Sequence, residues 1–205
     1  MAGSDPVSGR PHTCPSLYAR LLGGAWPDLP EPLRRMHALE DALSAAGRAK
    51  VERGAGALAN VVAALVGFPP ASDDVAVRVD FERRGDLEIW RRRFGDQTFH
   101  SRQQIGREQR LVESFGPAAF AMTLTWDGRR LNLRLRQWRF LGIPMPDWSA
   151  PVSTAYEEVI DGRFSFFVEI SHPWTGLIVR YSGWLEPIIV PARNLDPPRP
   201  TGRRR

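Results

Sequence analysis

Residues 75–94 read VAVRVDFERRGDLEIWRRRF, and this stretch decides the fold class. Val77, Val79 and Phe81 are separated by single charged residues, so apolar and polar side chains alternate. Successive side chains of a strand point to opposite faces, and this spacing therefore places the apolar set on one side of a sheet. The Arg84-Gly85-Asp86 triplet supplies a tight turn, so the stretch predicts a β-hairpin.

The same alternation returns at residues 120–126, 131–135 and 164–170. Asp127-Gly128 and Asp161-Gly162 lie between alternating segments, and Asp-Gly is a strong hairpin signal because glycine tolerates left-handed backbone geometry. Two further strands are expected around Gly106, in residues 98–115. The longer turn His172-Pro173-Trp174-Thr175-Gly176 leads into another strand over residues 177–185, and residues 142–151 form a proline-containing loop.

These patterns predict an α+β fold: a curved antiparallel β-meander of about eight strands, lipocalin-like or START-like, with N-terminal helices packed on it. Helices are expected at residues 17–22, 32–43 and 57–66, the first capped by Ser16 and the last ended by Gly67. A short strand is expected at residues 48–53.

The length of 205 residues fits one domain. Its expected limits are residues 16–187, after a disordered lead at 1–15 and before a tail at 188–205 that is rich in proline and arginine. The net charge is +5, but residues 187–205 contain five arginines and one acid, so the folded body carries only +1. A near-neutral body argues against a nucleic-acid surface on the fold.

Cys14 is the only cysteine, which excludes an intramolecular disulfide and a multi-cysteine metal site. We find no secretory signal and no apolar run long enough to span a membrane, so we expect a cytoplasmic protein. Gly54-Ala55-Gly56-Ala57-Leu58-Ala59 matches a loose dinucleotide fingerprint. The segment before it is mostly charged and no βαβ unit follows, which favours a turn before a helix. We expect no cofactor.

Arginines at alternate positions supply the candidate site, namely Arg134, Arg136 and Arg180. By strict alternation, Trp138 and Trp184 share the arginine face of their strands. If that face is the outside, the arginines are ordinary solvated residues. If it lines a cavity, they can bind the polar end of a ligand.

His172, beside Pro173 and Trp174, is a further candidate, because turns at a barrel rim often face ligands. Its alternative is a turn residue with a local hydrogen bond. We find no nucleophile elbow or other catalytic motif, and whether the chain is an enzyme stays open, with the balance against it.

Several segments together resemble the domain of unknown function DUF4166. They are Ser16-Leu17-Tyr18, Leu33-Arg34-Arg35-Met36-His37, Gly47-Arg48-Ala49, Arg92-Arg93-Phe94-Gly95, Leu141-Gly142-Ile143-Pro144-Met145-Pro146 and the run from Gly176 to Leu185. The resemblance implies a bacterial, cytosolic module that often follows saccharopine-dehydrogenase-like or short-chain-reductase-like NAD-binding domains. We expect this chain to carry the domain alone. The resemblance brings no activity and no catalytic residues.

Three functions are therefore considered. The first is a binding module that holds a small apolar or amphipathic ligand, with Trp138, Tyr181 and Trp184 as walls and Arg134, Arg136 or Arg180 at the polar end. The second is an accessory domain that acts in trans with a Rossmann-type oxidoreductase. The third is an enzyme with His172 or His100 as general base, which requires a carboxylate within hydrogen-bond reach.

Overall fold

A computed structural model describes residues 15–188. The expected disordered lead and arginine-rich tail, with Cys14, lie outside the described residues apart from Pro15 and Ile188. The described part contains three α-helices and three 3-10 helices. They are α1 (Leu17–Leu22), η1 (Gly23–Asp28), α2 (Glu31–His37), α3 (Ala57–Val66), η2 (Arg107–Gln109) and η3 (Asp147–Ser149).

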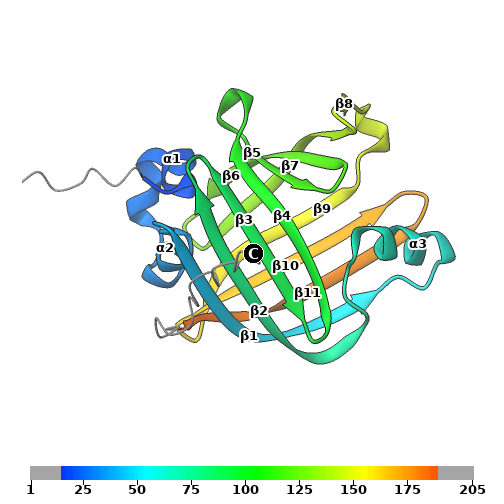
Figure 1. The fold of residues 1–205 in the computed structure, drawn as a ribbon, viewed down its shortest axis with the longest axis horizontal. Helices are drawn as coiled ribbons and strands as arrows, with labels where there is room; N and C mark the ends of the chain where they lie inside the picture. The colour runs from blue at the N-terminus through cyan, green and yellow to red at the C-terminus, as the bar shows by residue number, and fades with distance from the viewer. Residues whose placement is uncertain (1–14, 189–205) are drawn as a thin grey trace, which may run out of the picture.

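Eleven strands make up most of residues 15–188 (Figure 1). They are β1 (Ala42–Arg53), β2 (Ser72–Arg84), β3 (Leu87–Phe94), β4 (Gln97–Ile105), β5 (Leu111–Phe115), β6 (Ala118–Trp126), β7 (Arg130–Phe140), β8 (Ile143–Pro144), β9 (Val152–Ile160), β10 (Arg163–His172) and β11 (Gly176–Ile188).

Within the described residues, ten of these strands close into a barrel. Neighbours in the chain pair from β1 to β7, β9 pairs with both β7 and β10, and β11 returns to β1. Every pairing is antiparallel, as an even number of strands permits. The two-residue strand β8 only extends the end of β7. The predicted α+β class and antiparallel sheet are confirmed, but the sheet is a closed barrel of ten strands and not a curved meander of about eight.

The seam between β1 and β11 depends on glycine. A Cβ atom added at Gly47 would lie 1.8 Å from the carbonyl oxygen of Trp184, and one at Gly183 would lie 2.1 Å from that of Arg48. Both distances are far below contact, so the two backbones approach more closely than a side chain allows. Because this seam joins the first strand to the last, these glycines help to close the barrel. Lipocalin barrels have eight strands, so this one differs from that analogy in strand number.

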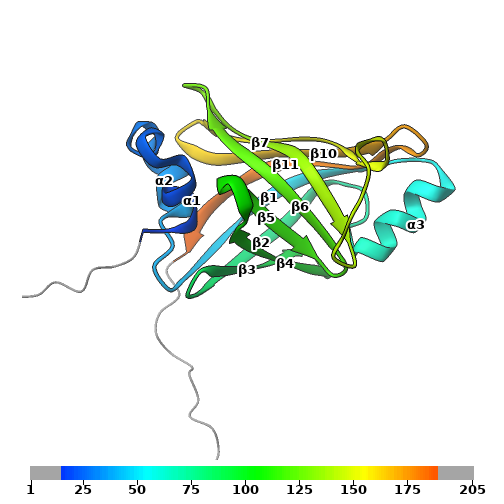
Figure 2. The same cartoon turned by 90° about the horizontal axis from the view of Figure 1, so that it is seen from above.

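Helices lie at the two ends of the barrel (Figure 2). At one end, α1 contacts β4 and β6, and α2 contacts β9 and β10. At the other end, α3 packs against β11. The expected packing of N-terminal helices on the sheet is therefore observed, although they cover an end of a closed barrel. Within residues 15–188, no helix is both long and apolar enough to cross a lipid bilayer.

The predicted helices at residues 17–22 and 57–66 are confirmed with the same limits. The Ser16 hydroxyl accepts a hydrogen bond from the Ala19 backbone at 3.3 Å, as an N-cap should, and Gly67 ends α3 with a φ of 81°. The predicted helix at residues 32–43 is wrong in its second half, because α2 ends at His37 and β1 begins at Ala42. Residues 42–53 pair with β2 on one side and β11 on the other, and these long-range ladders override local helix propensity. The predicted strand at 48–53 is the second half of β1.

Candidate functional site

The inside of the barrel holds a cavity of about 1120 Å³. Side chains that line it come from most of the strands, because alternate residues of each strand point inward. Most of the lining is apolar and much of it is aromatic, including Val77, Phe94, Phe99, Leu133, Phe166 and Tyr181. A cavity of this size and chemistry is typical of sites for small apolar molecules.

The two ends of the cavity differ in burial. At the end covered by α1 and α2, Tyr18 and Met36 line the cavity and are almost completely buried. At the end near α3, the lining includes Leu65, which is 82% exposed, and Trp174, which is 69% exposed. Trp174 contacts the exposed Trp148, with ring centroids 5.7 Å apart. We call the first the closed end and the second the open end.

A polar triad of Arg92, Ser101 and Glu113 lies on the inner face of β3, β4 and β5. Arg92 alternates with the outward-facing Arg91 and Arg93, and its guanidinium donates to the Ser101 hydroxyl at 2.7 Å and to Glu113 Oε1 at 3.0 Å. The Ser101 hydroxyl also donates to Glu113 Oε1, at 2.6 Å. The positive charge of Arg92 is therefore already paired inside the barrel.

A second polar group lies at the closed end. His37 Nε2 is 2.6 Å from Glu157 Oε2, and both residues are buried. The imidazole of His37 stacks on the phenol ring of Tyr18, with centroids 3.8 Å apart. Tyr18, which lines the cavity, is therefore connected to β9 through the imidazole of His37 and the carboxylate of Glu157.

Three polar atoms of the cavity lining have no hydrogen-bond partner among residues 15–188: Tyr18 Oη, Gln103 Oε1 and Trp138 Nε1. The backbone register places Gln103 directly beside Glu88 on one side and Glu113 on the other. Buried polar groups are nearly always paired, so each such atom calls for an explanation.

Burial keeps the phenols of Tyr18 and Tyr181 protonated. Burial raises the pKa of Tyr18 well above its ordinary value, and the carboxylates of Glu157, Glu113 and Glu88 raise that pKa further. Burial also raises the pKa of Tyr181 to about 12. The pKa of Glu88 is likewise raised by burial. Both phenols are therefore neutral hydrogen-bonding groups near pH 7.

Of the residues expected at the site, Trp138 and Tyr181 line the cavity. His172 lies at the open end, where its Nδ1 accepts a hydrogen bond from the Trp174 backbone at 3.2 Å. Neither His172 nor His100 has a carboxylate partner among residues 15–188, whereas His37, which the sequence did not single out, has Glu157.

Four expected residues lie outside the cavity lining. Arg134 and Arg136 are exposed and border a separate hollow of about 320 Å³. Arg180 forms ion pairs with Glu52 and Glu169, each at 2.6 Å, on the outer face of the barrel. On the same outer face, the Arg163 guanidinium lies 4.7 Å from the centroid of the Trp184 ring.

A β-bulge explains why Trp138 does not share a face with Arg134 and Arg136. The pairing of β6 with β7 shifts between Ala121 and Met122, so that Gln137 and Leu135 face consecutive residues and Arg136 is the extra residue. An extra residue reverses the alternation beyond it. Trp138 therefore points inward with Leu135, and the expectation that tryptophan and arginine share one face of this strand is wrong.

Sequence reasoning missed Arg92, Gln103, Glu113 and Tyr18. The sequence did contain a signal for Arg92, because Trp90, Arg92 and Phe94 occupy alternate positions of one predicted strand. That spacing places a charged residue on the apolar face. The pairing of Arg92 with Glu113 joins two strands that are not neighbours, and no spacing along the chain indicates it.

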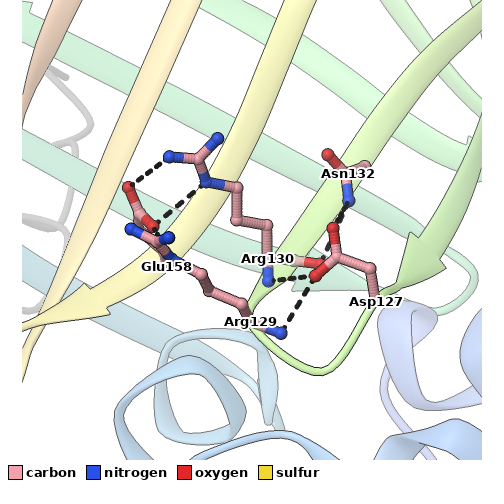
Figure 3. A network of polar contacts seen from close by, with 5 residues as sticks. All are labelled: Asp127, Arg129, Arg130, Asn132 and Glu158. Atoms are coloured by element: carbon pink, nitrogen blue, oxygen red, sulfur yellow. Dashed lines mark hydrogen bonds and ion pairs between the residues drawn. The ribbon is translucent and has the colours of Figure 1, made fainter.

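A separate polar network stabilises the turn of the β6–β7 hairpin (Figure 3). Asp127 Oδ1 accepts hydrogen bonds from the backbones of Arg129 and Arg130, at 2.9 and 2.7 Å. Arg130 in turn donates to both oxygens of Glu158 on β9, at 3.1 and 3.3 Å. This network joins the hairpin turn to β9, which is where β7 completes the barrel.

A family model with the description "Domain of unknown function (DUF4166)" matches residues 29–185, which include all of the barrel strands except the last three residues of β11. No curated protein matches the chain.

Proposed function

Since the chain belongs to the DUF4166 family, whose description assigns no activity, we propose a function from the barrel itself: it binds a small apolar or amphipathic molecule inside its cavity. The observation that carries this proposal is the cavity of about 1120 Å³, closed at one end and bordered by exposed apolar side chains at the other. Its lining has the apolar chemistry, with a few polar groups, that small-molecule sites share.

Packing supports the proposal. Protein interiors are as dense as organic crystals, and voids larger than a water molecule are few. Here, the inward side chains of opposite barrel walls leave a large space between them, although they include phenylalanine and leucine. In a narrower barrel, these side chains would be in contact. Ten strands enclose more space than eight, and barrels wider than the filled eight-stranded type enclose cavities.

The open end supplies a route for an apolar ligand. Leu58 and Leu65 of α3 lie at this end, together with Phe140 and Trp174. All four are exposed and also contribute to the cavity lining. An apolar molecule that enters here stays in contact with apolar surface from the rim to the inside.

The test is binding of the neutral fluorescent probe N-phenyl-1-naphthylamine to delipidated protein. Ala155 lines the cavity and faces Leu133 across β7 and β9, so Ala155→Phe fills part of the space. Thr154 is its exposed neighbour on the same strand, and Thr154→Phe is the matched control. We expect saturable binding that Ala155→Phe weakens at least tenfold and Thr154→Phe leaves unchanged.

Two results would overturn the proposal. One is no saturable binding of the probe, together with native mass spectra that contain no co-purified small molecule. The other is equal binding by Ala155→Phe, Thr154→Phe and the unmodified protein, which would place the probe on the surface. If Ala155→Phe does not fold, by circular dichroism, Leu133→Phe serves as the second cavity-filling variant.

A further inference from the structure

The closed end of the cavity has a chemistry of its own. Tyr18 is 0% exposed and Gln103 is 1% exposed, yet Tyr18 Oη and Gln103 Oε1 have no hydrogen-bond partner among residues 15–188. The two residues come from α1 and β4, which are in contact. Both line the same cavity. An unpaired buried polar atom destabilises a protein, so a ligand that supplies its partner gains binding energy there.

Resting on the proposed function, we propose that Tyr18 and Gln103, beside Glu113, form a subsite for an uncharged group that both donates and accepts hydrogen bonds, namely the hydroxyl at the end of an apolar ligand such as a long-chain alcohol.

Hydrogen-bond capacity favours a hydroxyl. Gln103 Oε1 can only accept, so its partner must donate. Tyr18 Oη carries a proton that it can donate, so a partner that also accepts satisfies it. Both hydrogen bonds of Glu113 from Arg92 and Ser101 fall on Oε1, which leaves Oε2 as another acceptor near Gln103. A hydroxyl meets both requirements, whereas a carboxylate accepts only and an ammonium donates only.

Charge argues against an ionised end group. Arg92 is already paired with Glu113 at 3.0 Å, and His37 lies against Glu157 at 2.6 Å. Among residues 15–188, the one arginine that lines the cavity is thus already paired, so a carboxylate ligand would be buried there without a cation to neutralise it, which is costly. A carboxylate would also face Glu157, Glu113 and Glu88, the same carboxylates that help to raise the pKa of Tyr18.

Three ligands with one chain length test the subsite: dodecanol, dodecanoate and dodecylammonium. Each is titrated against the probe-loaded protein at pH 7.5, and displacement gives its dissociation constant. We expect dodecanol to bind at least tenfold more tightly than either ion. Because an alcohol is also the more apolar solute, variants must show that the preference comes from the named residues.

The double variant Tyr18→Phe/Gln103→Met removes the two polar ends and keeps the side-chain volumes. It should weaken dodecanol binding about tenfold more than it changes probe binding. Gln104→Met is the matched control, since Gln104 is the exposed neighbour of Gln103 on β4, and it should change neither. Without ligand, Tyr18→Phe should raise Tm by about 2 to 4 °C, because it removes an unpaired buried hydroxyl.

The outcomes separate the subsite from the proposed function. If neither the probe nor dodecanol binds, the proposed function fails. If the probe binds but dodecanoate or dodecylammonium equals dodecanol, or if the double variant keeps full affinity for dodecanol, the subsite fails and the cavity function stands. A Tm for Tyr18→Phe that is lower than that of the unmodified protein would show that the hydroxyl is paired, which also overturns the subsite.

Discussion

Tyr18 and His37 stack face to face, with ring centroids 3.8 Å apart and ring planes only 14° from parallel. His37 Nε2 is in turn 2.6 Å from Glu157 on β9. One line of contacts therefore runs from α1 through α2 to the barrel wall. Since Tyr18 lines the cavity, the shape of the closed end depends on a hydrogen bond between residues 120 positions apart in the chain.

Replacing His37 should destabilise the protein strongly. His37→Leu leaves the buried carboxylate of Glu157 without its partner, and breaking such a pair from one side costs about 3 kcal/mol or more. We expect this loss in urea unfolding followed by circular dichroism. Arg48→Ala is the control, because it breaks an exposed pair with Asp74 and should have little effect. Equal losses in the two variants would contradict the prediction.

The pairing of Arg92 with Glu113 should appear as an interaction energy between two positions. Arg92→Leu alone and Glu113→Leu alone each leave a largely buried partner unpaired. The double variant removes both charges, so its loss of unfolding free energy should be smaller than the sum of the single losses by about 1 to 3 kcal/mol. Urea unfolding of the four proteins measures this difference. Strict additivity would mean that the pair contributes nothing.

Gly47→Ala should disrupt the seam that closes the barrel. The new Cβ would lie 1.8 Å from the Trp184 carbonyl oxygen, and only a shift of one backbone can relieve this clash. We expect a loss of at least about 2 kcal/mol in unfolding free energy. Gly24→Ala is the control, since nothing lies within 4 Å of its added Cβ. If the two variants are equally stable, the close approach of β1 and β11 is not required for closure.

Asp127 should titrate at unusually low pH. Hydrogen bonds from the backbones of Arg130 and Arg129 and from the Asn132 side chain lower its pKa from 3.8 to about 2 (Figure 3). Because the pKa is lower in the folded state, the stabilisation is complete above pH 3.8 and is lost as the pH falls toward 2. Carboxyl chemical shifts followed by NMR give the pKa directly. A value near 3.8 would show that the turn network does not form in solution.

The expected oxidoreductase partner and the cytoplasmic, bacterial setting stay predictions, since they concern molecules and surroundings outside the chain. Gene neighbourhood and co-purification test the partner. The ligand proposal needs neither of them, because it rests on the cavity inside this chain.

Local spacing predicted much of the fold correctly. The Asp127-Gly128 and Asp161-Gly162 turns each join two paired strands, and the helices at residues 17–22 and 57–66 have the expected limits. These features depend on residues close together in the chain, so alternation, turn and cap residues suffice to find them. The family resemblance is confirmed over residues 29–185.

The candidate site was less predictable, because it depends on which strand face is enclosed. Trp138 and Tyr181 do line the cavity, but Arg180 pairs with Glu52 and Glu169 on the outer face. Alternation divides a strand into two faces without saying which one is inside when both carry aromatic and charged residues. A single extra residue, Arg136, was enough to exchange the faces of β7.

The sequence by itself determined the antiparallel strands, their hairpins and two helices, because each is specified by interactions over a few residues. Only the tertiary structure decided that β11 returns to β1, that residues 42 and 43 join the sheet instead of a helix, and that Arg92, Gln103 and Tyr18 line one cavity. Those outcomes depend on contacts between distant segments, where the free energy of closing the whole barrel outweighs the preference of any one segment.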